Sequence, residues 1–310
     1  MKPLVIATRR SPLALWQAEF VGRALESFGR KVELLPLVTQ GDRILDAPLS
    51  RVGGKGLFVK EIEEALLDGR ADLAVHSLKD VPTHLPAGLV LGAVLEREDP
   101  RDALCAPAHR TLDALPPGAR VGTSSLRRRA QLLARRPDLE VVEVRGNVGT
   151  RLARLERDVD AVILAAAGLR RLGLEDRITE RLATDVLLPA VGQGALAVEI
   201  RADDEETAAL VRRLDHPDTR DAVRAERALL ARLEGGCQIP VAAHAEVAGE
   251  RLRLRARVGR LDGSELLEAR IEGPRAEAES IGIRAAEDLL ARGAGRILAE
   301  LEGVRVGLPH

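Results

Sequence analysis

The stretch LVIATRRSP, residues 4–12, decides the class of the fold. Its apolar first half, residues 4–7, predicts a buried strand. Ser11 is a favoured N-cap residue and Pro12 suits the first helical position, so a helix should follow directly and end near Gly29. A strand that leads straight into a helix begins a βαβ unit, which predicts a parallel sheet with helices packed against it.

The alternation of strand and helix continues in two successive units. In the first unit, further strands are expected at 32–38, 72–76 and 89–95, with a helix at 60–67. In the second unit, strands are expected at 120–122, 141–144 and 161–165, with helices at 125–135, 150–157 and 167–172. This order predicts two doubly wound α/β domains. From about residue 218 a helix, alternating strands and two further helices indicate a small α+β domain.

Cys237 lies in the loop EGGCQIP, residues 234–240, between the first helix and first strand of that last domain. Two glycines before it permit backbone conformations that a Cβ would forbid, and Pro240 fixes the exit of the chain. A single thiol in such a loop is a candidate nucleophile or covalent attachment point. The alternative is a small buried apolar side chain.

Composition limits the possible functions. With 310 residues, 45% hydrophobic and 31% charged, the chain is typical of a globular protein of two or three domains. We find no apolar run of about 18 residues and no secretory signal, and two distant cysteines make no disulfide framework. We therefore expect a cytoplasmic protein that does not bind membranes. The six histidines are scattered, so no metal site is expected.

The charged residues are mostly balanced but rich in arginine. The net charge is −1, with 42 arginines and five lysines, and aromatic residues make up 1% of the chain. A nucleic-acid binder should show a basic balance and aromatic stacking platforms, so this class is not favoured. Arginine's planar fork suits carboxylates and phosphates.

Polar residues gather where predicted strands end. HSLKDVP, residues 76–82, follows a strand directly, which places Lys79 and Asp80 where open α/β sheets bind ligands. Asp80 is suited to act as general acid and base, or to hold a ligand N–H or a cation. The alternative is a turn-forming aspartate before Pro82.

Three other strand-to-helix junctions carry arginine beside hydroxyl or glycine residues. In GTSSLRRR, residues 122–129, free backbone N–H groups form an anion site, and Arg127 and Arg128 add positive charge where the helix dipole disfavours it. RGNVGTR, residues 145–151, repeats the arrangement, as does Arg9 near the start. Either each is a solvated helix cap, or together they bind a molecule with several carboxylates or phosphates. A further stretch, residues 39–56, is glycine-rich and predicts a long loop over such a site, or an insertion without a role.

Eight motifs occur in order along almost the whole chain: ATRRSPLALWQA, VGGKGLFVKE, HSLKDVP, EREDPRDA, VGTSSLRRR, RGNVGTRL, LPAVGQGALA and LEGGCQIPVAAHA. They resemble the hydroxymethylbilane synthase (porphobilinogen deaminase) family. The resemblance implies two domains like type II periplasmic binding proteins around a cleft, residues 1–95 with 195–213 and residues 100–190. A third domain, residues 218–310, bears the cysteine.

The resemblance also implies the reaction. Such a transferase joins four porphobilinogen molecules head to tail, releases ammonia, and frees hydroxymethylbilane by hydrolysis. Cys237 would bear a dipyrromethane cofactor through a thioether, and Asp80 would protonate the departing amine and later accept a proton. The resemblance also suggests a monomer and implies that no metal is needed.

The implied binding residues neutralise the acetate and propionate groups of the pyrroles. They are Arg9, Ser11, Ser77, Lys79, Thr123, Ser124, Ser125, Arg127, Arg128, Arg145, Arg151, Arg171, Gln193 and Gly194, with Lys55 and Phe58 in the lid. Arg170 is the alternative to Arg171. The main rival function is a non-catalytic solute-binding protein of the same fold, which would need neither Cys237 nor Asp80.

Overall fold

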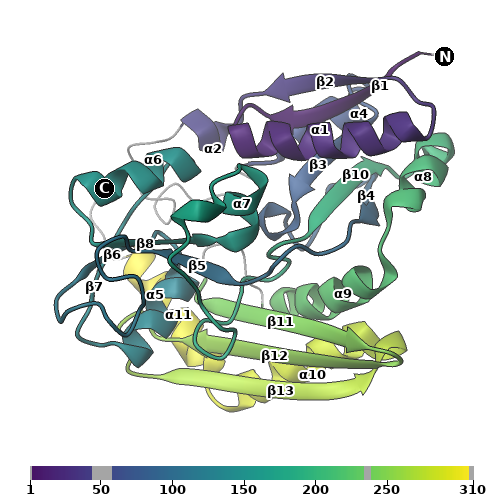
Figure 1. Cartoon of the computed structure of the whole chain (residues 1–310). Helices are drawn as coiled ribbons and strands as arrows, with labels where there is room; N and C mark the ends of the chain where they lie inside the picture. Colours follow the sequence, from purple (N-terminus) through teal and green to yellow (C-terminus); the bar gives the residue numbers. More distant parts are fainter. Residues whose placement is uncertain (1, 44–57, 234–238, 307–310) are drawn as a thin grey trace.

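The computed structural model describes residues 2–43, 58–233 and 239–306. Its strands form three separate sheets, two of five strands and one of three (Figure 1). Lys55 and Cys237, and most of the predicted loop at 39–56, lie outside the described residues. At the start of that loop a short helix, α2 (Gln40–Arg43), is described.

The first sheet has the strand order β2-β1-β3-β10-β4. Its strands are β1 (Leu4–Arg9), β2 (Val32–Leu37), β3 (Leu73–Ser77), β4 (Leu89–Val94) and β10 (Leu196–Arg201). β1 runs parallel to β2 and β3, whereas β10 is antiparallel to both β3 and β4. Ile6 packs with the residues of α1 (Pro12–Ser27), and its neighbour Ala7 packs with α4 (Lys60–Leu67) on the other face. Side chains that alternate between two helical layers make this sheet doubly wound.

The second sheet repeats this arrangement in the order β7-β6-β8-β5-β9. Its strands are β5 (Asp102–Cys105), β6 (Arg120–Gly122), β7 (Glu140–Val142), β8 (Ala161–Ala165) and β9 (Glu180–Arg181). Its helices are α5 (Leu126–Arg135), α6 (Val148–Leu152) and α7 (Ala166–Arg171). The sequence did not indicate β5. The single helix expected at 150–157 is wrong, because α6 ends at Leu152 and a 3₁₀ turn, Ala153–Glu156, follows.

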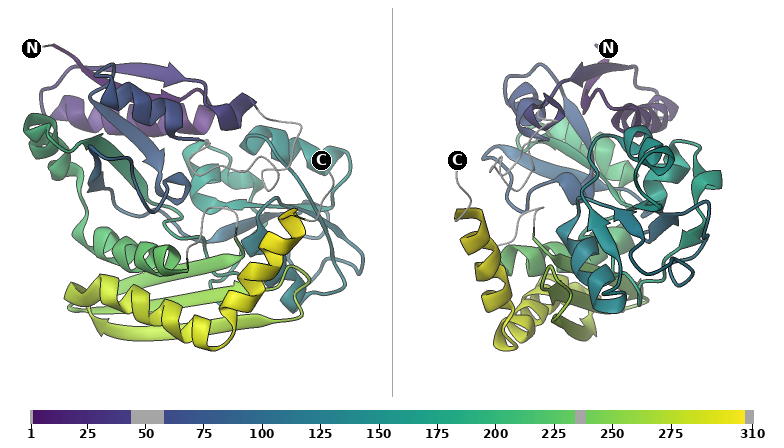
Figure 2. Two further views of the ribbon diagram at one scale, coloured as in Figure 1. Left: turned by 180° about the vertical axis from the view of Figure 1, so that it is seen from behind. Right: turned by 90° about the vertical axis from the view of Figure 1, so that its left-hand side faces the viewer.

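The third sheet is antiparallel and consists of β11 (Val241–Ala248), β12 (Arg251–Gly259) and β13 (Leu266–Pro274). α9 (Pro217–Arg232), α10 (Ala278–Ala291) and α11 (Ala294–Val306) complete this part, and α8 (Glu205–Val211) precedes it. The yellow C-terminal helices lie on one face of the green strands (Figure 2). A Cβ on Gly282 would lie 2.2 Å from the Ala225 carbonyl oxygen, so glycine permits the close contact of α10 with α9.

The connections between the sheets converge on one buried carboxylate, Glu226 of α9. Arg97, in the connection from β4 to β5, donates to it through Nη1 at 2.6 Å and Nη2 at 3.1 Å. The N–H of Gly192, in the connection back to β10, donates at 2.7 Å, and the N–H of Ala245 in β11 donates at 2.8 Å. Glu226 thus joins the three parts of the chain.

This contact predicts sensitivity to acid. Burial alone raises the pKa of Glu226, but Arg97 and His244 outweigh burial and hold it at about 2, below the ordinary 4.5. A lowered folded-state pKa adds stability that is present above pH 4.5 and is lost as the pH falls towards 2, on the order of 3 kcal/mol. Glu226→Gln should flatten the dependence of the unfolding free energy on pH in this window, measured by urea unfolding. Glu206→Gln, at an exposed carboxylate, should leave it unchanged.

The predicted fold class, two doubly wound α/β units and a small α+β unit, is confirmed. The domain boundaries at 1–95 with 195–213, 100–190 and 218–310 stay a prediction.

Candidate functional site

Asp80 lies at the carboxyl end of β3. A 3₁₀ turn, Leu78–Asp80, follows the strand directly. The turn is fixed because the Leu78 side chain is buried and its N–H donates to the Ala195 carbonyl at 3.0 Å. Asp80 lines a cavity of about 60 Å³ together with Arg9, Ser11, Ser77, Phe58 and other residues of the same edge. The structure therefore brings together five of the predicted site residues.

The cavity walls are held by local contacts. The Arg9 guanidinium pairs with Asp42 and lies 4.5 Å from the centroid of the Phe58 ring. The Ser77 hydroxyl accepts a hydrogen bond from the buried Gln17 amide at 2.8 Å. Ser11 caps α1, where its hydroxyl accepts from the Ala14 N–H at 3.3 Å. Arg9 and Ser11 thus reach the cavity from the first strand-to-helix junction.

The N-terminus of α5 is built as the sequence predicts, with Ser125 as its cap. The Ser125 hydroxyl accepts from the Arg128 N–H at 3.4 Å, and the Ser125 N–H donates to the Thr123 hydroxyl at 3.2 Å. Thr123 is buried and Ser124 half-buried. The guanidinium groups of Arg127 and Arg128, however, turn inward and are 4% and 5% exposed. They are not residues of a solvated helix face.

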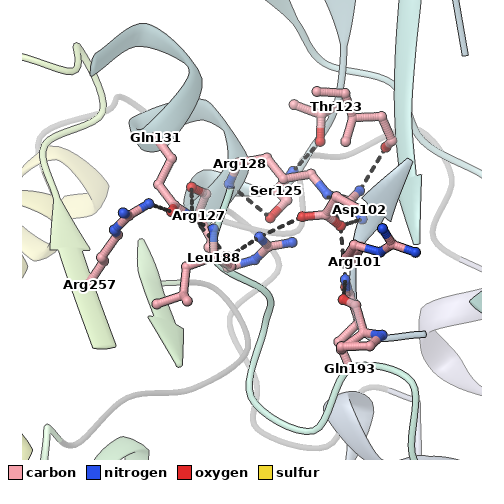
Figure 3. Close-up of polar contacts among 12 residues, drawn as sticks. Arg101, Asp102, Thr123, Ser125, Arg127, Arg128, Gln131, Leu188, Gln193 and Arg257 are labelled. Carbon is pink, nitrogen blue, oxygen red and sulfur yellow. Dashed lines mark hydrogen bonds and ion pairs between the residues drawn. The ribbon is translucent and has the colours of Figure 1, made fainter. Parts of the chain in front are cut away.

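Both guanidinium groups contact one fully buried carboxylate, Asp102 of β5 (Figure 3). Arg127 donates to Asp102 Oδ2 through Nη1 at 2.7 Å, and Arg128 donates to Oδ1 through Nη2 at 2.7 Å. The Gln193 amide also donates to Oδ1, at 3.0 Å. Burial alone would raise the pKa of Asp102, but the two arginines outweigh burial and hold it far below its usual range. Two cations share one anion, so this cluster has an excess of positive charge.

Arg145 and Arg151 belong to the junction before α6, which Asn147 caps by accepting from the Thr150 N–H at 2.9 Å. Arg151 Nε donates to the Gly146 carbonyl at 2.8 Å. Among the described residues, Arg145 Nη1 is buried and has no hydrogen-bond partner. Both arginine side chains are therefore held against the protein. Their guanidinium groups can still donate further hydrogen bonds.

The cations of this region act on one another and on Asp80. Burial, followed by the charge of Arg128, lowers the pKa of Arg151 to about 10, while Asp80 opposes the change. Burial also lowers the pKa of Lys79 to about 8, with Asp80 again opposing and Arg128 adding to it. Lys79 and Arg151 thus interact electrostatically with both Asp80 and Arg128, and Arg151 also interacts with Arg145, although these residues come from different parts of the sequence.

Arg171 lies apart from this group, at the connection that returns to β10. Its Nη2 donates to the Gly194 carbonyl at 2.7 Å, and its guanidinium carbon lies 5.9 Å from the centroid of the Trp16 ring. Burial lowers the pKa of Arg171 to about 10. Arg170 is more exposed and pairs with Glu98 at 2.8 Å. Gly194 has a φ of +91°, and a Cβ there would lie 2.3 Å from the Glu98 carbonyl oxygen.

The sequence did not indicate a role for Asp102, which lies in the motif EREDPRDA, residues 96–103. The residues around Asp102 show no strand or helix periodicity that would mark a buried carboxylate. The one feature of the sequence that could have indicated a buried carboxylate is the position of this aspartate directly before the apolar residues 103–106. The described residues contain no group of three or more His, Cys, Asp or Glu side chains that could hold a metal ion. No helix among them is long and apolar enough to cross a membrane.

Comparisons with known proteins show which family this chain resembles. The model of the porphobilinogen deaminase dipyromethane cofactor binding domain matches residues 4–209, and that of the C-terminal domain of porphobilinogen deaminase matches residues 221–291. The chain is 58% identical over 302 residues to a porphobilinogen deaminase of Syntrophotalea carbinolica, covering 96% of each sequence.

Among solved structures, it is similar to a periplasmic substrate-binding protein of an ABC transporter from Coxiella burnetii, with 18% identity and a TM-score of 0.42 over 70% of this chain and 94% of that one. It is also similar to protein PG110 from Staphylococcus aureus, with 12% identity and a TM-score of 0.42 over 92% of this chain and 100% of that one.

Proposed function

The chain belongs to the porphobilinogen deaminase family, and from this premise we propose that it is the transferase that makes hydroxymethylbilane. It would join four porphobilinogen molecules head to tail with release of ammonia, and then hydrolyse the product from the enzyme. The observation that supports this most is the group of buried and half-buried cations around Asp80. A substrate with two carboxylates on each ring requires such a group, together with one acid–base residue.

The residues present fit a dipyrromethane cofactor. Arg127 Nε and Arg145 Nη1 are buried and have no hydrogen-bond partner within the described parts of the chain. The pair Arg127 and Arg128 has one positive charge more than Asp102 neutralises. Carboxylates of a bound group would satisfy both the spare donors and the excess charge. We propose that Arg127, Arg128, Arg145 and Arg151 hold these carboxylates and that the Cys237 thiol supplies the covalent link.

When bound, the dipyrromethane supplies a terminal pyrrole with a free carbon that acts as nucleophile. The protein's own contribution is then binding, orientation and proton transfer. Asp80 lies at the end of the turn after β3. Its carboxylate would hold pyrrole N–H groups and would give and take a proton at its oxygens. Arg9, Ser11, Ser77 and Phe58 line the cavity beside it and would position the incoming ring. The family resemblance adds Lys55, which lies outside the described residues, as a lid residue together with Phe58.

The remaining binding residues, the oligomeric state and the location are proposed from the family and the composition. Thr123, Ser124 and Ser125 would donate hydrogen bonds to carboxylates at the start of α5, and Gln193, Gly194 and Arg171 would shape the connection between the two α/β units. We propose a monomer in the cytoplasm with porphobilinogen as its small-molecule partner, and neither nucleic acid nor membrane as partner. A solute-binding protein would need no thiol in the 234–240 loop and no acid–base residue at position 80.

The intact mass of the denatured protein tests this function. Purified wild-type protein should exceed its polypeptide mass by two linked pyrrole units, and Cys237→Ser should lack the excess because its hydroxyl does not form the thioether. Cys105→Ser is the matched control and should keep the excess, because burial raises the pKa of the Cys105 thiol to about 11 and leaves it unreactive. A bare polypeptide mass in all three, unchanged after porphobilinogen is added, would contradict the proposal.

A further inference from the structure

A buried acid–base cluster borders the cavity that Asp80 lines. His76 of β3 is 5% exposed, and Glu199 of β10 is fully buried. The His76 ring Nε2 lies 2.9 Å from Glu199 Oε2. Glu63 of α4, 8% exposed, interacts electrostatically with both of them and is counted here as the third member of the cluster. None of the three belongs to the binding or catalytic residues named above.

The cluster holds more acid groups than its one base can neutralise. Among the described residues, one oxygen of Glu63 and one of Glu199 are buried without a hydrogen-bond partner. Burial, followed by the charge of Glu199, raises the pKa of Glu63 to about 7, while His76 opposes the change. An unpaired buried charge is costly, so burial favours the protonated form of Glu63. The Glu63 carboxyl group therefore gains or loses a proton near neutral pH.

His76 connects this cluster to the site, because it lines the same 60 Å³ cavity as Asp80 and Ser77. The described part of the chain shows one hydrogen bond of the ring, to Glu199. When Nε2–H donates to that carboxylate, Nδ1 is the nitrogen with a lone pair for a proton. A carboxylate that orients an imidazole in this way is the arrangement by which enzymes fix a general base.

We propose that His76 is a second proton-carrying residue of this site, oriented by Glu199, and that it exchanges protons with Asp80 through water in the shared cavity. The inference rests on the proposed function, in which Asp80 must alternate between its acid and its carboxylate form at every condensation. A proton leaves the Asp80 carboxyl oxygen, passes through water, and is bound at His76 Nδ1; the reverse transfer restores the acid. A cavity of 60 Å³ has room for such water.

The other charges near the cluster are engaged elsewhere. From β10, Arg201 donates to the carbonyls of Leu66 and Ala71 and pairs with Asp204. From β1, Arg9 pairs with Asp42. From α4 itself, Glu64 also raises the pKa of Glu63, but less than burial and Glu199 do. Glu199 and Glu63 are therefore the charged groups that interact with His76 inside the protein, and Asp80 lines the same cavity.

The test uses His76→Gln in the holoenzyme, because the glutamine N–H can still donate to Glu199 but cannot titrate. We expect kcat to fall by about 10²-fold and one ionisation to vanish from its pH profile. The second readout is independent of activity: in NMR, the ring signals of one histidine, assigned by their absence in His76→Gln, should shift with pH as the ring takes up and releases a proton. Glu63→Gln should move that titration to lower pH, because it removes a negative neighbour. The matched control, Glu64→Gln on the same helix, should not.

The outcomes separate the inference from the function. If the wild-type enzyme elongates the chain and His76→Gln keeps the wild-type pH profile, the inference is overturned and the proposed function stands. If His76→Gln is too unstable to assay, the effect of Glu63→Gln on the NMR titration decides: an unmoved titration overturns the inference. No turnover of porphobilinogen by the wild type would overturn both.

Discussion

Asp80→Asn is expected to lower kcat by about 10²–10⁴-fold, the range typical of removing a general acid–base group. The amide keeps the size of the side chain and its contact with the cavity, but it neither gives nor accepts the proton that each condensation requires. Substrate should still bind, because the surrounding cations remain. The measurement is single-turnover elongation, followed by the intact mass after porphobilinogen is added, so that each condensation is counted separately.

Two variants control this experiment. Asp80→Glu retains an acid–base group at a slightly different position and should recover part of the rate. Glu98→Gln alters a carboxylate that pairs with the more exposed Arg170 and should elongate at the wild-type rate. Near-normal elongation by Asp80→Asn would remove Asp80 from proton transfer and leave it a binding residue.

Asp102→Asn is expected to lower the free energy of unfolding by about 3–5 kcal/mol, because it leaves two buried guanidinium groups without their carboxylate. Gln193 would also lose a charged acceptor. The change should reduce the content of the covalent cofactor as well, since Arg127 and Arg128 would no longer be held in one orientation. Urea unfolding measures the first effect, and intact mass measures the second.

The matched control is Asp113→Asn, which breaks the pair of Asp113 with Arg135. Their side chains are 71% and 46% exposed, so the loss should be at most about 1 kcal/mol. If Asp102→Asn were as mild as this control, the two arginines would have another counter-charge in solution, and the buried cluster would not be held by Asp102.

The outline of the fold follows from local signals in the sequence. Ser11 and Pro12 fix the start of α1, and Ser125 fixes the start of α5, because capping and turn chemistry act within a few residues. The strand-to-helix junctions that end in Asp80, Ser125 and Asn147 were also evident, since ligand-binding groups follow strands in open α/β sheets. Local sequence patterns did not predict β5, and they predicted one helix over residues 150–157 where the structure has the end of α6 and a 3₁₀ turn. Tertiary packing determines the structure of both segments.

Sequence alone determined the family, the fold class and the group of side chains able to bind carboxylates, because each depends on residue type and short spacing. Tertiary structure decided which of those side chains form ion pairs or hydrogen bonds with other residues of the protein. Arg127 and Arg128 contact Asp102 from another strand, and His76 contacts Glu199 across the ladder between β3 and β10. Such pairs join residues that are far apart in the chain, and burial makes their charges interact strongly. Neither the distance between two side chains nor their burial can be obtained from spacing along the sequence.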